Sequence, residues 1–244
     1  MTTYRVDFAY EGTGFHGYAK QSEVRTVQGE LETALFRLTG VVETAVAGRT
    51  DKGVHARAQV VSFDADDDLD TDLVVRSLNR QLAPEIAVRS VVEAPAGFSA
   101  RFSATSRAYK YFLLNRKTPD PFIARTSWHY ATPLDIDRMN EGVFHLVGQH
   151  DFASLCRKSG TRSTERRLDQ VVWSRGEDGL LVCDVAASSF CHQMVRSLVA
   201  LSVEVGRGRL RPDDVAGILA ARDRRVAKGA APARGLTLVA VGYD

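Results

Sequence analysis

Hydrophobic and polar residues along the chain follow two periods, one typical of strands and one typical of helices. Residues 4–8 alternate apolar and polar side chains with a period of two, which predicts a half-buried strand. After Thr26, a reasonable N-cap, apolar residues recur at helical spacing as far as Leu38, and Gly40 then ends the pattern. Helical spacing returns over 136–146. The pattern therefore predicts strands and amphipathic helices in succession.

The two halves of the chain show a similar order of predicted elements: a strand, a helix, paired strands, a second helix and a final strand. Further predicted segments are helices over about 73–80 and beginning within 189–196 and 211–213, and strands over 86–92, 107–114, 168–173, 180–186 and 236–243. The prediction is an α/β fold of the α+β type, with two similar ferredoxin-like or RRM-like α/β subdomains over 1–104 and 105–244. We expect them to share an extended, mainly antiparallel sheet, with helices on one face and a central active-site cleft.

A glycine-bounded turn at Gly48–His55 connects two β-prone stretches, 41–46 and 58–63. This connection places the carboxylate of Asp51 at a strand end, on a rigid scaffold. Arg49 lies two residues away, within reach to keep that carboxylate ionised and oriented. Taken alone, such a run is more often an ordinary turn, in which the aspartate bonds its own backbone and the arginine is a solvated charge.

Three other segments are candidates for contact with a nucleic acid. The stretch Phe15–Gln21 is aromatic and basic, and it is either a loop packed on the core or a nucleic-acid contact. Residues 157–167 carry five basic side chains and one acidic one, which favours phosphate contact, although exposed charge runs are usually just solvated. Arg101 lies between Phe98 and Phe102, where it is either a snorkelling surface residue or a phosphate clamp.

Two pairs in the second half carry candidate chemistry. Tyr109 and Tyr111 share one face of a predicted strand, where such residues normally belong to the core or the sheet surface. His192 and Arg196 are four residues apart at the start of a predicted helix, hence on one face near an N-terminus that favours anions. No second histidine or carboxylate stands at ligand spacing from His192, so a metal site is not indicated.

Composition narrows the class of protein without naming a partner. The 244 residues are 44% hydrophobic and 25% charged with a net charge of +2, which is ordinary globular composition that permits RNA binding without favouring it. No apolar run approaches the length of a membrane span. The three cysteines, Cys156, Cys183 and Cys191, are odd in number and contain no Cys-x-x-Cys pair, so neither a disulfide framework nor a zinc cluster is predicted. We expect a soluble protein of the reducing cytoplasm.

The turn Gly48–Ala56 is one of several motifs that stand in order along the chain. The others are Thr26–Gln28, Phe102–Ala104 followed by Tyr109-x-Tyr111, Gly148–Phe152, Ser189–Arg196 and Ala231–Leu236. Together they resemble the TruA family of tRNA pseudouridine synthases, which act on the anticodon arm. The resemblance covers nearly the whole chain, from Tyr4 to Tyr243, and several ordered motifs are far more specific than one.

The resemblance implies that the protein isomerises uridine to pseudouridine in the anticodon stem-loop, at the family's positions 38, 39 and 40. It makes Asp51 the catalytic residue, as nucleophile or base, with Arg49 as its buried partner. Tyr109 would stack on the target base and act as the proposed general base, and Arg196 would be the second active-site arginine. The remaining substrate-binding residues implied are Leu236, which lines the pocket, Arg101, which contacts tRNA, His55 and His192.

The chain departs from the family pattern at three places. It has Tyr18 where the family usually has tryptophan, and Lys52 where alanine commonly follows the aspartate. The usual His-His-Met-Val-Arg run appears as Cys191–Arg196 with the sequence Cys-His-Gln-Met-Val-Arg. None of these changes removes a catalytic group, and Lys52 is a candidate for an added phosphate contact.

The implied reaction breaks the bond from N1 to C1′, turns the uracil and joins C5 to C1′, so no cofactor is required. An aspartate, with a reference pKa near 3.9, is ionised at neutral pH and suits the first step, whether it attacks C1′, attacks C6 or acts at C2′. Family resemblance also implies a homodimer with tRNA across both subunits. The alternatives are a non-catalytic RNA-binding protein, which leaves Asp51 without a role, and a glycoside hydrolase, which requires a second acid that the sequence lacks.

Overall fold

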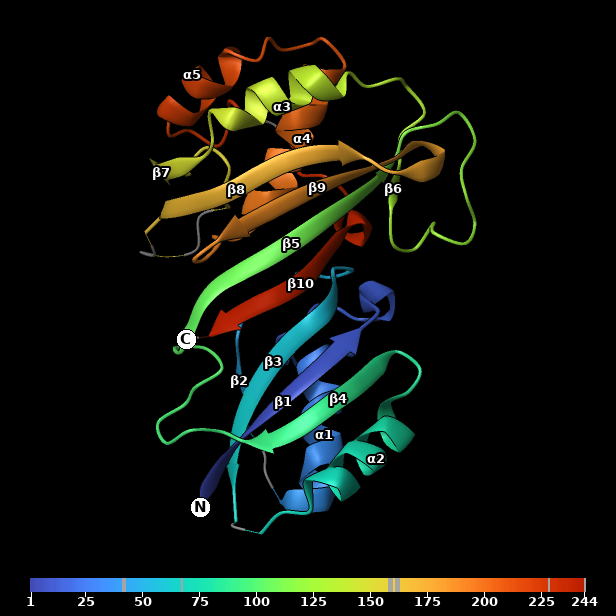
Figure 1. Ribbon diagram of the computed structural model, residues 1–244, viewed down its shortest axis with the longest axis vertical. Helices are drawn as coiled ribbons and strands as arrows, with labels where there is room; N and C mark the ends of the chain where they lie inside the picture. The colour runs from blue at the N-terminus through green and yellow to red at the C-terminus, as the bar shows by residue number, and fades with distance from the viewer. Residues whose placement is uncertain (41–42, 67, 158–159, 161–162, 228, 244) are drawn as a thin grey trace. The chain divides into compact units, whose positions relative to one another are not determined.

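The computed structural model folds into two compact units, each built of strands and helices (Figure 1). It describes residues 1–40, 43–66, 68–157, 160, 163–227 and 229–243. The first unit comprises Met1–Thr105 and Thr237–Asp244, and the second comprises Ser106–Leu236. Both are mixed α+β with mainly antiparallel pairing, so the predicted fold class is confirmed. The predicted division near 104 differs in one respect, because the C-terminal strand belongs to the first unit.

The first unit follows the predicted order of strand, helix, two strands, helix and strand. Its elements are β1 (Thr2–Tyr10), α1 (Val27–Thr39), β2 (Ala45–Val46), β3 (His55–Ala65), α2 (Thr71–Leu82), β4 (Ile86–Glu93) and the C-terminal β10 (Leu236–Tyr243). The strand order is β4-β1-β3-β10, with β2 on β3. The β1 strand is antiparallel to both neighbours, whereas β10 runs parallel to β3.

Local sequence explains why these elements form where they do. Alternation in β1 turns four large side chains to one face, where they are buried: Tyr4, Val6, Phe8 and Tyr10. Burying a side chain such as Phe8 contributes about 2 kcal/mol. The Thr26 hydroxyl caps α1 by accepting from Gly29 N–H at 3.2 Å, and Gly40 ends it in the left-handed region with φ of 71°.

The second unit holds the remaining elements. They are β5 (Ala104–Leu114), β6 (Trp128–His129), α3 (Ile136–Phe144), β7 (Gly148–Asp151), β8 (Glu165–Arg175), β9 (Leu180–Ala187), α4 (Met194–Gly206) and α5 (Asp214–Ala220). Its strand order is β5-β9-β8-β7, with β6 on β5. The α4 helix is buried on most of its surface, because it packs against α3 and the sheet, and Trp173 on β8 donates to Ser202 on α4 at 3.1 Å.

Three sequence-based expectations need correction. The segment 157–167 is not one flexible basic loop, since Arg166 and Arg167 belong to β8; Lys158 and Arg162 lie outside the described residues. The β-prone stretch 41–46 contributes only the short β2, and Val41 and Val42 are likewise outside the described part. The third correction concerns the cysteines.

Cys156 and Cys191 are paired, although the sequence predicted no disulfide. Their Cα atoms are 5.8 Å apart, within the range of disulfide-bonded cysteines, and Cys183 is a buried free thiol. The two residues stand 35 positions apart in sequence, and only the packing of the segment after β7 against the segment before α4 brings them together. Among the described residues, no helix is long and apolar enough to cross a membrane.

Candidate active site

The predicted glycine-bounded turn connects β2 to β3, which pair with each other as antiparallel strands. Backbone hydrogen bonds close the turn at both ends, from Ala47 N–H to Val60 O at 3.0 Å and from Val54 N–H to Asp51 O at 3.1 Å. Gly53 takes a φ of 78°, a conformation that favours glycine. Asp51 is half-buried at the tip of this turn, so its carboxylate stands on a backbone that neighbouring strands hold in place.

Buried side chains of the first unit form hydrogen bonds with residues of the same turn. The Gln59 side-chain amide donates to Gly48 O at 2.9 Å, and the hydroxyls of Tyr10 and Thr50 are 2.8 Å apart. Sequence analysis did not single out Tyr10, Thr50 or Gln59 as site residues. A polar glutamine among the apolar residues of β3 is the one local signal that could have pointed to them.

The stretch Phe15–Gln21 packs against the turn with its backbone. Gly17 has a φ of +98°, and a Cβ there would lie 3.1 Å from Thr50 O and 3.2 Å from Lys52 N. Phe15 and Tyr18 are fully buried, which favours the core-packing interpretation of this stretch for its aromatic rings. The stretch therefore shapes the turn from inside the unit, and its outer side chains remain available for a ligand.

Two basic side chains flank Asp51 on the outer surface. Lys52 and His16 are both exposed, and the Lys52 amine lies 3.1 Å from Nε2 of His16. Arg49 is also exposed, and no ion pair between Arg49 and Asp51 is found among the residues that the structure describes. Arg49 is therefore not buried as the resemblance implied, and its role beside Asp51 stays a prediction.

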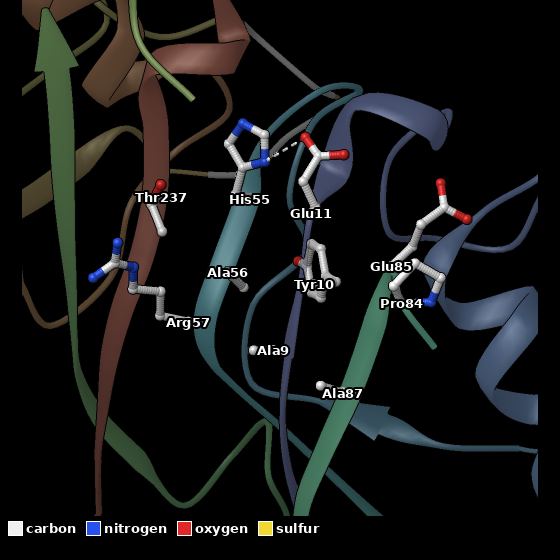
Figure 2. Close-up of a pocket in the computed structure, with 10 residues that line it drawn as sticks. All are labelled: Ala9, Tyr10, Glu11, His55, Ala56, Arg57, Pro84, Glu85, Ala87 and Thr237. Atoms are coloured by element: carbon white, nitrogen blue, oxygen red, sulfur yellow. Dashed lines mark ion pairs between the residues drawn. The ribbon is translucent and has the colours of Figure 1, made fainter. Parts of the chain in front are cut away.

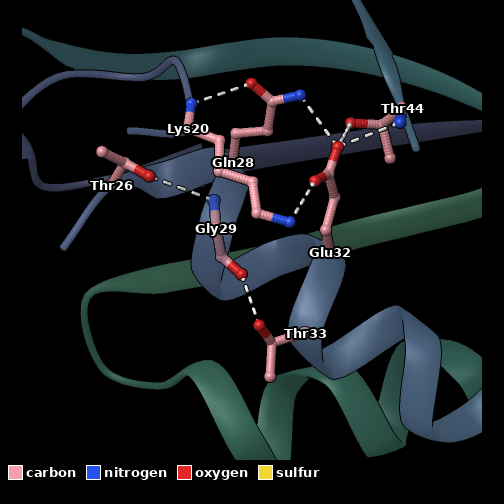
Figure 3. Close-up of polar contacts among 7 residues, drawn as sticks. All are labelled: Lys20, Thr26, Gln28, Gly29, Glu32, Thr33 and Thr44. Atoms are coloured by element: carbon pink, nitrogen blue, oxygen red, sulfur yellow. Dashed lines mark hydrogen bonds and ion pairs between the residues drawn. The ribbon is translucent and has the colours of Figure 1, made fainter. Parts of the chain in front are cut away.

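A buried carboxylate fastens α1 to the strand that leads into the turn (Figure 3). Glu32 accepts hydrogen bonds from Gln28 Nε2 at 2.8 Å and from both the N–H and the hydroxyl of Thr44 at 3.1 Å, while Lys20 Nζ lies 3.4 Å away. Gln28 in turn accepts from Lys20 N–H at 3.0 Å. This network ties the start of β2 and the end of the 15–21 stretch to one helix, and sequence reasoning missed it.

A shallow pocket of about 210 Å³ opens next to the turn, lined by side chains from β1, β3, β4 and β10 (Figure 2). His55 lines it and is almost fully buried; its Nδ1 accepts from Gly12 N–H at 2.9 Å, with a Glu11 carboxylate oxygen 3.3 Å from the same nitrogen. Tyr10, Arg57 and Glu85 are the other ionisable residues of this lining.

Arg101 stands on a tight turn at the end of the first unit's main segment. Ser103 N–H donates to Ser99 O at 2.9 Å, which closes the turn, and the Arg101 guanidinium lies 5.0 Å from the centre of the Phe102 ring. Phe102 is 80% exposed. An arginine stacked on an exposed aromatic ring presents both a charge and a flat surface, which suits contact with RNA.

In the second unit, the paired tyrosines have separate environments. Tyr109 on β5 lies opposite Val185 on β9, and its ring meets Phe190 edge-on at 5.2 Å between centroids. Tyr111 is fully buried and donates to Pro232 O at 2.8 Å. Burial raises the pKa of Tyr111 well above its ordinary value, against the opposing influence of the Arg196 charge. Tyr111 is therefore a core residue, edge-on to the Trp128 ring of β6 at 6.4 Å, whereas the aromatic neighbour of Tyr109 is Phe190.

Arg196 and Leu236 are connected through the segment 231–235. The Arg196 guanidinium donates from Nε to Ala231 O at 2.8 Å, and Ala231 N–H donates back to Arg196 O at 2.9 Å. Gly235 lies against the Tyr111 ring so closely that a Cβ would be 2.5 Å from Cζ. Leu236 follows directly and is buried, so α4 and β5 together set the position of the residue expected to line the pocket.

His192 does not share a helical face with Arg196, contrary to prediction. The α4 helix begins only at Met194, and Gln193 has a φ of 65°, so His192 precedes the helix and is exposed. Its carbonyl accepts from Arg157 N–H at 2.9 Å, beside the Cys156–Cys191 pair. The described residues contain no cluster of three or more His, Cys, Asp or Glu suited to hold a metal ion.

The chain is similar in sequence to known proteins over nearly its whole length. A family model described as tRNA pseudouridine synthase matches residues 8–103 and 143–244. The chain is similar to tRNA pseudouridine synthase A of Leifsonia xyli subsp. xyli, at 44% identity over 265 residues, covering 99% of this chain and 92% of the relative. It is similar to the protein of that name from Moorella thermoacetica, at 42% identity over 247 residues and 100% of both chains.

Solved structures add little to this comparison. A crystal structure of a Cbf5-Nop10-Gar1 complex aligns with 82% of this chain and 54% of its own at 12% identity, with a TM-score of 0.35. That likeness is too weak to guide the assignment of residues. The sequence relatives, aligned from end to end, are what identify the chain.

Proposed function

The chain belongs to the tRNA pseudouridine synthase family and isomerises uridine to pseudouridine in tRNA; we propose that Asp51 is its catalytic carboxylate and that its targets lie in the anticodon stem-loop. The observation that supports the role of Asp51 is the place of this half-buried residue on a turn that backbone and side-chain hydrogen bonds hold in position. A fixed, accessible carboxylate is what covalent or base catalysis at a sugar or pyrimidine ring requires.

The reaction rearranges uridine without any net transfer of atoms. The N1–C1′ bond breaks, the uracil rotates, C5 bonds to C1′, and the proton on C5 leaves. Asp51 serves the first step by attack at C1′, by attack at C6 or by action at C2′, and each route requires its carboxylate to touch the detached sugar or base. None of the three routes calls for a cofactor.

The family resemblance also assigns roles to three residues of the second unit. Tyr109, with Phe190 against its edge, stacks on the target base and assists loss of the C5 proton. Stacking is the better supported role, since a tyrosine is a weak base at neutral pH. Arg196, fixed by its double contact with Ala231, supplies a positive charge, and Leu236 supplies an apolar contact for the substrate.

The target nucleotide has to leave its stack, which costs a few kcal/mol, and basic residues on the neighbouring phosphates offset that cost. In the first unit, Lys52 with His16 and Arg101 with Phe102 are the candidates for such contacts. His55 and His192 remain proposed substrate contacts, the first in the pocket wall and the second on the exposed segment before α4.

We also propose a cytoplasmic homodimer, as the family resemblance implies. In that compartment we expect Cys156 and Cys191 to be thiols, because cytoplasmic reductants keep such pairs reduced. Counting free thiols in rapidly quenched cell extract checks this expectation.

The experiment that tests the proposal uses anticodon stem-loop transcripts with a single uridine at position 38, 39 or 40, and matched transcripts with the uridine moved to another stem. Conversion in the anticodon set alone supports the proposed specificity, and equal conversion in both sets contradicts it. The Asp51→Asn variant is expected to bind tRNA without converting it. Binding without conversion by the native protein would support instead a non-catalytic RNA-binding protein.

A further inference from the structure

A continuous chain of buried hydrogen bonds runs beneath the catalytic turn. Gln59 Nε2 donates to the Tyr10 hydroxyl at 3.2 Å, and the Tyr10 hydroxyl is 2.8 Å from Oγ1 of Thr50, the residue before Asp51. All three members are buried: Gln59 is 0% exposed, Tyr10 4% and Thr50 8%. A polar network in such a position specifies one arrangement of the backbone, because each unpaired member would carry a desolvation penalty.

The orientation of the Gln59 amide is fixed by its partners. The side-chain nitrogen lies 2.9 Å from Gly48 O, and the side-chain oxygen accepts from Val60 N–H at 3.2 Å. A flipped amide would set one oxygen against another at Gly48 and a nitrogen donor against the Val60 N–H. Both amide hydrogens of Gln59 are therefore committed, one to Gly48 and one to Tyr10.

This orientation fixes the donor at one end of the network. The Tyr10 oxygen accepts from Gln59, and it lies 2.8 Å from the Thr50 hydroxyl, in a hydrogen bond in which either oxygen can be the donor. Burial raises the pKa of Tyr10 to about 12, so its phenol stays protonated throughout the physiological pH range.

A β-bulge directs Tyr10 toward the turn. Phe8 pairs with Gln59 and Tyr10 with Ala56, so β3 contains one residue more than β1 between these two pairs. Bulges of this kind redirect side chains and are common next to active sites. As a result, two hydrogen bonds from one glutamine-tyrosine pair reach both sides of Arg49, at Gly48 O and at Thr50 Oγ1.

We propose that Tyr10 and Gln59 are positioning residues for the isomerisation, which fix the Gly48–Asp51 backbone through Thr50 before tRNA binds. The inference rests on the proposed role of Asp51. It assigns the buried network an effect on turnover, in addition to any effect on folding, because a carboxylate displaced by a fraction of an ångström loses much of its effective concentration at the reacting atom.

The test compares Tyr10→Phe and Thr50→Val with Tyr4→Phe in steady-state assays on an anticodon stem-loop transcript. Tyr4 is a matched control, because it is a buried tyrosine of the same strand whose hydroxyl is also hydrogen-bonded, here by accepting from the backbone N–H of Leu69 at 3.3 Å, away from the turn. We expect Tyr10→Phe and Thr50→Val each to lower kcat about tenfold or more, with KM changed less than about twofold. Tyr4→Phe should leave kcat within about twofold.

Two further variants separate positioning from folding. Thr50→Ser keeps the hydroxyl and is expected to restore most of kcat. The double variant Tyr10→Phe, Thr50→Val is expected to lose no more than the worse single variant, because both changes break the same bond. Thermal unfolding of every variant is measured alongside.

Equal kcat for Tyr10→Phe, Thr50→Val and Tyr4→Phe, with Asp51→Asn inactive, overturns the positioning role and leaves the proposed function intact. Additive losses in the double variant, or a rise in KM at constant kcat, likewise overturn it. Full activity of Asp51→Asn contradicts the proposed function itself, so the two failures are distinguishable.

Discussion

The main-chain N–H of Tyr18 donates a hydrogen bond of 3.0 Å to the carbonyl oxygen of Thr50, the residue that precedes Asp51. Gln28 N–H bonds Tyr18 O at 2.9 Å, so the same residue connects the catalytic turn to the first turn of α1. The stretch Phe15–Gln21 thus braces the turn with its backbone while its aromatic rings fill the core. Substitutions in this stretch are expected to affect the reaction through the position of the turn.

Gly17→Ala tests this brace. We expect a loss of stability of roughly 1–3 kcal/mol and a lower kcat, since an alanine at φ of +98° is strained and its Cβ would press on Thr50 O. Gly97→Ala is the matched control, with a φ of +78° and no atom within 4 Å of the added Cβ. If both variants lose the same stability and keep full kcat, close contact at Gly17 has no part in positioning the turn.

Glu32→Ala removes the buried carboxylate shown in Figure 3. Its loss leaves the Thr44 N–H and hydroxyl and the Gln28 amide without their acceptor, so we expect a decrease of about 3 kcal/mol in the free energy of unfolding. Urea titration measures it. Glu30 is half-exposed and lies two residues earlier in α1. Glu30→Ala should lower the free energy of unfolding by less than about 1 kcal/mol. Equal losses at the two positions contradict the special role of Glu32.

Lys52→Ala should weaken tRNA binding and make it less dependent on salt. One lost phosphate contact lowers the slope of log Kd against log salt by about one. Fluorescence anisotropy with a labelled anticodon stem-loop measures both, and Lys117→Ala, which removes an exposed lysine of the second unit, serves as the control. An unchanged slope for Lys52→Ala would show that the amine bonded to His16 does not meet a phosphate.

Stability at high pH reports on Tyr10. Its pKa is raised from 10.0 to about 12, so the folded state holds this proton more tightly than the unfolded state between those values. The contribution of the protonated Tyr10 phenol to the free energy of unfolding is fully present below pH 10. It is lost as pH rises toward 12, and the total loss is about 2–3 kcal/mol. Tyr10→Phe should flatten the fall in unfolding free energy over this range, relative to the native protein. An identical fall in both proteins contradicts the burial of an un-ionised phenol.

The parts of the fold that sequence predicted are those fixed by neighbouring residues. Thr26 and Gly40 bound α1 because a side-chain acceptor and a left-handed glycine are local requirements of helix ends. The strand at Leu236–Tyr243 was also predicted correctly, because its β-prone residues are neighbours in the sequence. The turn carrying Asp51 was likewise predicted from its glycines and flanking strands.

The parts that sequence missed depend on contacts between distant residues. Tyr10 and Gln59 are 49 positions apart, and only the pairing of β1 with β3 makes them neighbours. In the sequence, nothing distinguishes Glu32 from other helix residues, because its contact with Thr44 forms only when the chain folds. Gln193 adopts a left-handed conformation, so α4 begins only after it and His192 lies outside the helix that carries Arg196. No local rule predicts this conformation for Gln193.

Single-turnover conversion by Asp51→Asn tests the central claim most directly. Excess enzyme is mixed with a radiolabelled anticodon stem-loop, pseudouridine is measured over time, and binding is measured on the same samples; Asp169→Asn, an exposed aspartate of β8, is the matched control. The account predicts that Asp51→Asn binds the stem-loop within about threefold of the native protein and converts none, whereas Asp169→Asn converts normally. Pseudouridine formation by Asp51→Asn at the native rate would contradict it.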